Sequence, residues 1–130
     1  MQIYGIGTDL VKCERITEMW DAHGMTFARR ILTEYELAAL VQQRNNQAGF
    51  LAKRFAAKEA ASKALGTGFS NDVLLTQVGV ETDSAGKPSL VFYGQTKEYV
   101  KKLGCLDVHL SISDEADYVV AFVIISKFKD

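Results

Sequence analysis

The segment GFLAKRFAAKEAASKALGTG, residues 49–68, decides how the rest of the chain is arranged. Phe50–Leu65 is rich in Ala, Leu, Lys, Glu and Arg and lacks Pro, a composition that predicts a long α-helix. Asn45 or Asn46 can cap its start, and Gly66 lies where a left-handed residue would end it. Small and charged side chains occur all around this helix, so other elements can approach it closely from several sides. Any charge that this packing buries needs a partner.

Glu59 and Lys63 fall on one stripe of this predicted helix, because each residue advances the helix by about 100°. One interpretation is an exposed i,i+4 ion pair worth about 0.2–0.5 kcal/mol, the ordinary role of such pairs. The other interpretation places both side chains in a functional site. The choice depends on which residues from other parts of the chain lie beside them.

The composition is that of an ordinary globular domain. The 130 residues are 48% hydrophobic and 24% charged, which predicts one domain spanning residues 1–130. The formal net charge is −1, so no general basic field recruits nucleic acid or an acidic membrane. We therefore expect neither as a partner, and any electrostatic docking must be local.

Cysteine usage and the N-terminus predict the cytosol as the compartment. Cys13 and Cys105 lack CxxC spacing and are expected to be reduced core thiols, with a disulfide between them as the alternative. The first residues, MQIYGIG, contain no basic and apolar segments of a secretory signal. The longest apolar run, Tyr118–Ile125, is too short to span a bilayer.

The N-terminal segment Gln2–Val11 is predicted to be a strand with two different faces. Strict alternation places Tyr4, Ile6, Thr8 and Leu10 on one face and Ile3, Gly5, Gly7, Asp9 and Val11 on the other. The two glycines leave the surface beside Asp9 bare. Such glycines mark either the close approach of a backbone or ligand, or a bend or bulge in the strand with Asp9 capping the next element. For this pattern alone the second interpretation is favoured.

Three short helical segments are predicted between this strand and the long helix. Lys12–His23 carries a stripe expected to be buried, which consists of Ile16, Met19, Trp20 and His23. Gly24 ends it, and the basic piece Phe27–Arg30 can form a further turn. Thr33 and Glu36 form a capping box that starts a helix over Glu34–Gln43.

The C-terminal half predicts mainly strands. Val78–Thr82 and Ser89–Tyr93 form a hairpin around a turn at residues 83–88, and a helix follows over Thr96–Leu103. The next strand has an apolar face opposite His109, Ser111 and Ser113, which are either solvated or line a site. Tyr118–Ile125 is apolar on both faces and must be covered on both, which indicates self-association. The predicted class is α+β, with a mainly antiparallel sheet packed against one long Ala-rich helix.

The candidate chemistry is that of a magnesium–phosphate site. The sequence contains no Walker loop, nucleophile elbow, HExxH motif or Cys/His cluster. Its remaining polar groups of interest are Asp9, Glu59, Lys63 and the His109 strand face. Two carboxylates from different elements suit Mg²⁺, and the nearby cations suit phosphate oxygens. This combination fits phosphoryl-type transfer.

Three segments, GIGTDLVKCERI (residues 5–16), RFAAKEAASKALGTG (54–68) and LSISDEADYVVAFVI (110–124), resemble the bacterial holo-acyl-carrier-protein synthases, the small class of 4′-phosphopantetheinyl transferases. The resemblance implies transfer of 4′-phosphopantetheine from coenzyme A to a serine of apo acyl carrier protein, in support of fatty acid biosynthesis. It also implies Mg²⁺ dependence and a homotrimer with active sites between subunits. The alternatives are the same chemistry on a specialised, polyketide-type carrier, or a non-catalytic coenzyme A-binding trimer.

The resemblance also implies site residues. Asp9 and Glu59 are the expected Mg²⁺ ligands, Lys63 would neutralise the departing bisphosphate, and Glu59 is the candidate base, directly or through a bound water. The residues expected to contact coenzyme A are Arg54, Lys58, Lys63, Gly66, Gly86, Pro88, His109 and Ser111. The residues expected to dock the acidic carrier are Lys12, Arg15, Met19 and Arg29. Asp114 stands where many family members have His, and we assign it no role.

Overall fold

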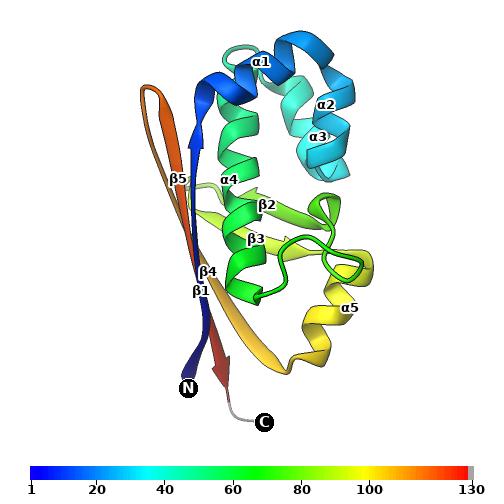
Figure 1. Cartoon of the computed structure of the whole chain (residues 1–130), viewed down its shortest axis with the longest axis vertical. Helices are drawn as coiled ribbons and strands as arrows, with labels where there is room; N and C mark the ends of the chain where they lie inside the picture. Colours follow the sequence, from blue (N-terminus) through cyan, green and yellow to red (C-terminus); the bar gives the residue numbers. More distant parts are fainter. Residues whose placement is uncertain (129–130) are drawn as a thin grey trace.

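Helix α4 (Gln47–Leu65) is the centre of the fold, and two antiparallel sheets pack around it (Figure 1). The structure, a computed structural model, describes residues 1–128 apart from the side chain of Cys105. The remaining elements are β1 (Gln2–Lys12), α1 (Cys13–His23), α2 (Met25–Ile31), α3 (Glu34–Gln42), the 3-10 turn η1 (Leu75–Gln77), β2 (Val78–Thr82), β3 (Pro88–Phe92), α5 (Gly94–Lys102), β4 (Cys105–Glu115) and β5 (Tyr118–Phe128). The predicted α+β class is confirmed, although the strands form two sheets, β1-β5-β4 and β2-β3.

Local signals at both ends of α4 explain its length. Asn46 adopts the left-handed conformation (φ 55°), and its side chain accepts the backbone N–H of Gly49 at 3.0 Å. The helix therefore begins at Gln47, three residues before the predicted start at Phe50. Gly66 (φ 82°) ends it in the left-handed conformation, as predicted.

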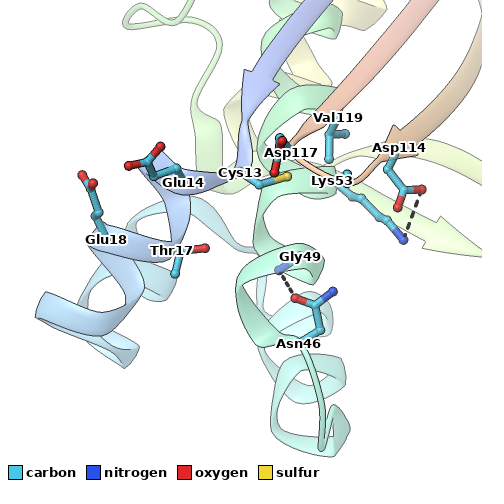
Figure 2. Close-up of a pocket in the computed structure, with 11 residues that line it drawn as sticks. Cys13, Glu14, Thr17, Glu18, Asn46, Gly49, Lys53, Asp114, Asp117 and Val119 are labelled. Carbon is cyan, nitrogen blue, oxygen red and sulfur yellow. Dashed lines mark hydrogen bonds and ion pairs between the residues drawn. The ribbon is translucent and has the colours of Figure 1, made fainter.

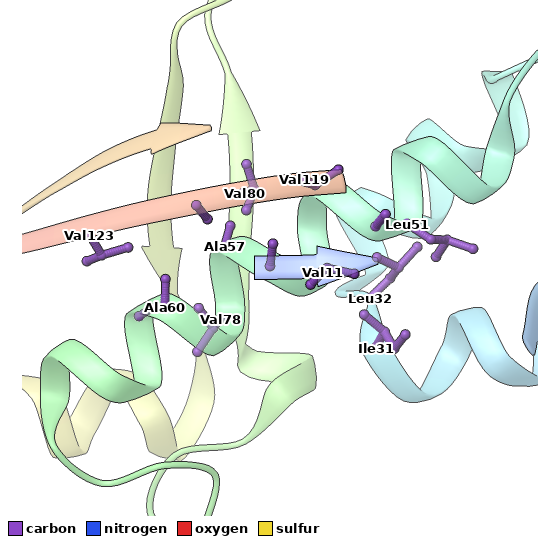
Figure 3. Packing of buried hydrophobic residues seen from close by; sticks show 14 of the residues in the cluster. Val11, Ile31, Leu32, Leu51, Ala57, Ala60, Val78, Val80, Val119 and Val123 are labelled. Atoms are coloured by element: carbon purple, nitrogen blue, oxygen red, sulfur yellow. The ribbon is translucent and has the colours of Figure 1, made fainter. Parts of the chain in front are cut away.

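Alanines on three sides of α4 allow the neighbouring elements to pack closely. Ala52, Ala56, Ala57, Ala60 and Ala61 are all 0% exposed. Figure 3 shows Ala57 and Ala60 among valines from three different strands, which are Val11 of β1, Val78 and Val80 of β2, and Val119 and Val123 of β5. The helix thus joins both sheets in one core.

The backbone of β1 lies against the backbone of α4. A Cβ atom on Gly5 would lie 1.8 Å from the Ala64 carbonyl oxygen, and one on Gly7 would lie 1.9 Å from the Ala60 carbonyl oxygen. The first interpretation of these glycines, the close approach of another backbone, is confirmed. The strand is also irregular, because its register against β5 shifts between Ile3 and Gly5. The shift turns Tyr4 toward the core and leaves Ile3 52% exposed, so strict alternation was wrong for these two residues.

The outer face of the β1-β5-β4 sheet is apolar and uncovered within one chain. Along β5, Val119, Ala121, Val123 and Ile125 are buried under α4. The alternate side chains face outward together with those of β1, and the most exposed are Ile6 (58%), Leu10 (66%), Tyr118 (47%), Val120 (37%) and Phe122 (43%). The chain therefore covers only one of the two apolar faces of β5.

Helix α1 buries a narrower stripe than predicted. Ile16 is buried and Trp20 is partly buried, but Met19 is 41% exposed and His23 is exposed. The prediction of a four-residue buried stripe was wrong because Gly24 (φ 53°) turns the chain directly into α2, which leaves the Met19–His23 side largely uncovered by the described residues. Helices α1, α2 and α3 gather near the N-terminal end of α4, and α5 lies near its other end (Figure 1).

Most other predicted elements are confirmed with small shifts. Helix α3 begins with the predicted capping box, in which the Thr33 hydroxyl accepts the N–H of Glu36 and Glu36 accepts the N–H of Thr33. The β2–β3 hairpin turns at residues 83–87, where Asp83 accepts the N–H groups of Ala85 and Lys87. Helix α5 begins at Gly94, two residues earlier than predicted.

Cys13 is a free thiol. No helix within residues 1–128 has both the length and the apolar content to cross a membrane.

Candidate functional site

Asp9, Glu59 and Lys63 converge where β1 crosses α4. The Lys63 ammonium donates to Asp9 Oδ1 at 2.9 Å and to the Thr8 carbonyl at 3.0 Å. The Asp9 side chain is 16% exposed, whereas that of Lys63 is 52% exposed. Lys63 therefore pairs with a carboxylate from β1, 54 residues away, and not simply with its helical neighbour Glu59. The glycines of β1 make this meeting possible, because they let Asp9 come within reach of the helix.

The electrostatics of this cluster favour an additional positive charge. Burial raises the pKa of the Glu59 carboxyl, the nearby Asp9 carboxylate raises it further, and Lys63 only partly opposes both effects. Two carboxylates thus lie close enough to influence each other, and the one ammonium bonded in this cluster, that of Lys63, pairs with Asp9. A bound cation would relieve their mutual repulsion.

The donor set fits Mg²⁺ bound together with a phosphate ligand. Within residues 1–128, no group of three or more His, Cys, Asp or Glu side chains could enclose a metal ion. Mg²⁺ does not require such a cage, since one or two carboxylates, substrate phosphates and waters complete its shell. Asp9 and Glu59 are the residues that would hold it.

A stability measurement checks this electrostatic description. Glu59→Gln is expected to raise the melting temperature of the metal-free protein at neutral pH, because it removes a carboxylate that its surroundings disfavour. The folded-state pKa of Glu59 is raised, so its contribution to stability is full below the unfolded-state pKa and is lost as the pH rises through the folded-state pKa. The difference between variant and wild type should therefore vanish toward about pH 4.

Thermal unfolding in the presence of chelator, from about pH 4 to about pH 8, measures this difference. Glu98→Gln serves as the control, because Glu98 is exposed on α5 and pairs only loosely with Lys101 at 3.9 Å. Equal melting temperatures of Glu59→Gln and wild type across this whole pH range would contradict the conclusion that the surroundings of Glu59 disfavour its ionised carboxylate.

A cleft of about 320 Å³ joins this cluster to the exposed side of α1. Its lining combines the two carboxylates with three of the predicted carrier-docking residues, Lys12, Arg15 and Met19. The apolar part of the lining consists of Leu10, Val11, Ile16, Phe27 and Phe55. A smaller hollow beside it is lined by Met19, His23, Thr26, Phe27 and Arg30, and so by Arg30 rather than the predicted Arg29. The sequence-based prediction did not name Phe27 and Arg30 as docking residues, and their place beside Met19 appears only in the structure.

Arg54 lines a separate polar cleft of about 360 Å³ at the start of α4. Its guanidinium carbon lies 3.8 Å from the centroid of the Phe50 ring. Its Nε is buried and has no hydrogen-bond partner among the described residues. Lys53 lines the same cleft, so two cations face a space that could hold an anion.

Lys58 is the predicted phosphate contact that the structure contradicts. Its side chain is 0% exposed, and its ammonium lies 2.7 Å from Glu36 Oε1, whose side chain is also 0% exposed. The carbonyls of Leu75 and Val78 accept from the same ammonium, so all three of its protons are used within the chain. Lys58 therefore holds the fold together and does not reach a ligand. Its partner Glu36 was predicted only as a capping residue.

The other predicted coenzyme A contacts do not meet Asp9 and Glu59 within one chain. Ser111 lies opposite Phe122 on the outer face of the sheet, and His109 follows it two residues away on the same face. Asp9 lies on the inner face, under α4. Gly66 is exposed at the end of α4, and Gly86 and Pro88 lie on the β2–β3 hairpin.

Asp114 lies at the end of β4 and faces Lys53 across another hollow, of about 520 Å³ (Figure 2). Its Oδ1 is 3.7 Å from the Lys53 ammonium, and both side chains are substantially exposed. Glu14, Glu18 and Asp117 line the same hollow, which makes it acidic and unsuited to a phosphate. Nothing in this arrangement connects Asp114 to the Asp9 cluster.

Comparison with known proteins identifies the family. A family model described as the 4′-phosphopantetheinyl transferase superfamily matches residues 5–123. The chain is 50% identical over 123 residues to the holo-acyl-carrier-protein synthase of Halorhodospira halophila, covering 95% of this chain and 97% of that protein. The crystal structure of the holo-acyl-carrier-protein synthase from Neisseria meningitidis matches with a TM-score of 0.92 at 43% identity, over 97% of this chain and 100% of that one.

A second solved structure adds a ligand. The holo-acyl-carrier-protein synthase from Bacillus anthracis, in complex with coenzyme A (3′,5′-ADP), matches with a TM-score of 0.83 at 36% identity, over 98% of this chain and 100% of that one. The family model and both full-length relatives agree with the resemblance seen in the three sequence segments. The chain belongs to the 4′-phosphopantetheinyl transferase superfamily, among the holo-acyl-carrier-protein synthases.

Proposed function

We propose that this protein transfers 4′-phosphopantetheine from coenzyme A to a serine of apo acyl carrier protein and releases adenosine 3′,5′-bisphosphate. The observation that carries the proposal is the convergence of Asp9, Glu59 and Lys63 beside a cleft that also presents cationic and apolar side chains. The names of the full-length relatives and the coenzyme A complex of one of them support it.

The reaction assigns a separate task to each of the three residues. The serine oxygen forms a bond to the pantetheine-side phosphorus of coenzyme A, and the bond from that phosphorus to the bridging oxygen breaks. Lys63 lies where it can neutralise the departing bisphosphate. Glu59 takes the serine proton, directly or through a water, and its raised pKa suits that task. Mg²⁺ held by Asp9 and Glu59 would neutralise charge on the phosphate oxygens.

Intact mass of the carrier protein tests the function. Apo acyl carrier protein incubated with this chain, coenzyme A and Mg²⁺ should gain one phosphopantetheine, and the gain should disappear with excess chelator. Absence of any gain on a folded carrier would contradict the proposal and would favour the alternatives of a specialised carrier or a non-catalytic coenzyme A-binding protein. Offering a polyketide-type carrier in parallel separates these two. The expected role in fatty acid biosynthesis depends on the first carrier being preferred.

We also propose a homotrimer in which each site lies between two subunits. The apolar outer face of the β1-β5-β4 sheet needs a cover, and in a closed ring of three copies these faces of neighbouring subunits can cover one another. His109 and Ser111 lie on that outer face. Together with the turn that contains Gly86 and Pro88, they would therefore complete the site of a neighbouring subunit. Light scattering should give three times the chain mass of 14.4 kDa, and a monomer would contradict the shared site.

Carrier docking should depend on the cationic rim of the α1 cleft. Arg15→Glu is expected to raise the KM for the carrier about tenfold or more while leaving the KM for coenzyme A unchanged, because it reverses a charge that faces an acidic partner. Steady-state kinetics with each substrate varied in turn measures both constants. Lys97→Glu on α5 is the matched control. A comparison of Arg29→Glu with Arg30→Glu shows which of these two arginines contributes to carrier docking. A rise in the KM for coenzyme A alone would contradict this docking surface.

The remaining proposals concern organisation and compartment. We propose that residues 1–130 form one domain, since α4 contributes to the packing of both sheets. The cytosol stays the predicted compartment, and cell fractionation would test it.

A further inference from the structure

The free edge of strand β2 is bonded by two side chains in place of a strand. Val80 N–H donates to Glu36 Oε2 at 2.8 Å, and the Val78 carbonyl accepts from the Lys58 ammonium. Residues two apart in a strand direct their backbone groups to the same edge, and the opposite edge of β2 is paired with β3. Glu36 and Lys58 together therefore supply one acceptor and one donor along that edge.

This pair joins four elements and leaves none of its own polar groups unused. Glu36 Oε1 accepts from the N–H of Thr33 at 2.9 Å and from Lys58 at 2.7 Å, while Oε2 binds β2. Lys58 also donates to the Leu75 carbonyl in η1 at 3.2 Å. The contacts thus run from the start of α3, through α4, to η1 and β2. Because both side chains are 0% exposed, water cannot replace any of these bonds.

The two elements held most directly carry different parts of the proposed site. Lys58 directly precedes Glu59 in α4, and Lys63 follows Glu59 by about one turn, so the anchoring of Lys58 restrains the rotation of the helix that presents both residues. The β2–β3 hairpin carries Gly86 and Pro88, the turn proposed to hold the adenosine end of coenzyme A. Whichever subunit's site the turn enters, the buried pair bonds the strand that leads into it to α3 and α4.

We infer that Glu36 and Lys58 are positioning residues for coenzyme A, which act by holding the β2–β3 hairpin at a set position against α4. This inference rests on the proposed transfer function. It gives Lys58 an indirect role in place of the phosphate contact that its burial excludes. A purely structural pair would affect stability alone, whereas a positioning pair also affects coenzyme A kinetics in protein that remains folded.

The test compares Glu36→Gln, Lys58→Met and the double variant Glu36→Gln/Lys58→Met with a destabilised control. The double variant leaves no unpaired buried charge, so it is the variant to use if the single changes prevent folding. Leu40→Ala is the control, because Leu40 is 2% exposed on the same helix as Glu36 and takes no part in the pair. All variants are assayed well below their melting temperatures.

The kinetic result expected is a split between the two substrates. The pair variants should raise the KM for coenzyme A, or lower kcat, by about 10- to 100-fold, as misplacement of a binding element does. Their KM for the carrier should stay within about twofold of wild type, because Lys12, Arg15 and Met19 lie on β1 and α1, which none of the bonds of the pair reaches. Pair variants whose coenzyme A kinetics match those of Leu40→Ala would overturn the inference.

Amide hydrogen exchange gives a readout that does not depend on activity. In the wild type the Val80 amide should be strongly protected, and in the pair variants its protection should fall while that of Val123 in β5 stays high. A wild-type Val80 amide that exchanges as fast as Ala85 at the hairpin tip would overturn the inference even if no variant folded. Absence of transfer by the wild type would instead refute the proposed function and leave the exchange result standing.

Discussion

Asp9→Ala should lower the rate of phosphopantetheine transfer by about 1,000-fold or more, because a metal ligand contributes several kcal/mol of transition-state charge stabilisation. The loss should come with little change in stability. Asp9 pairs with a Lys63 side chain that is 52% exposed, and such pairs are worth about 1 kcal/mol or less. Removing Asp9 also relieves the repulsion that raises the pKa of Glu59. Initial rates at saturating Mg²⁺ and the melting temperature are the two measurements.

The Asp9 result is interpretable because its controls separate charge, metal and fold. Asp72→Ala removes an exposed carboxylate from the loop after α4 and should leave the rate unchanged. Asp9→Asn keeps the shape and loses the charge, so it should resemble Asp9→Ala. Wild type with excess chelator should be as inactive as either variant. Transfer by Asp9→Ala within about tenfold of wild type would contradict the assignment of Asp9 as a metal ligand.

Gly7→Ala is expected to destabilise the fold by about 3 kcal/mol or more, the upper range for overpacking, because its Cβ would meet only backbone. The added atom would lie 1.9 Å from the Ala60 carbonyl oxygen and 2.7 Å from the Ala64 nitrogen, and neither can move without moving α4. The melting temperature should fall by roughly 10 °C. Displacing β1 from α4 also separates Asp9 from Lys63, so transfer should be lost with the stability.

Thermal and urea unfolding measure this effect, with Thr8→Ala as the control. Thr8 is the next residue of β1, and its exposed side chain points to the opposite face of the sheet. Gly5→Ala should behave like Gly7→Ala, since its Cβ would lie 1.8 Å from the Ala64 carbonyl oxygen. A Gly7→Ala protein within about 1 kcal/mol of wild type would show that the strand and helix are not in backbone contact.

Features encoded within a few residues were predicted well from the sequence. The capping box at Thr33 and Glu36, the glycine that ends α4 and the hairpin turn each depend on contacts that neighbouring residues make with one another. The start of α4 was predicted three residues late because Asn46 adopts a left-handed conformation, which composition does not reveal. The faces of Ile3 and Tyr4 were exchanged by a register shift that depends on β5.

Burial on α4 was the main feature that the sequence could not specify. Arg54 and Lys58 are both cations on one helix and look equivalent in the sequence. In the structure Arg54 lies beside a cleft and has a buried Nε that finds no hydrogen-bond partner within residues 1–128, whereas Lys58 is enclosed by Glu36 and two carbonyls. The difference comes from what packs against each side of the helix. The same holds for the hollow on the exposed side of α1. Phe27 and Arg30 line it because the turn at Gly24 brings α2 beside α1.

The α+β class, the long Ala-rich helix, the family, and the candidacy of Asp9, Glu59 and Lys63 could all be predicted from the residues alone. These depend on composition, periodicity and local motifs, which are readable along the chain. The pairing of Lys63 with Asp9 across 54 residues, and that of Lys58 with Glu36 across 22, became visible only once the chain was folded. Such pairings depend on how closely two backbones approach and which way a helix is rotated, and both are set by packing of the whole core.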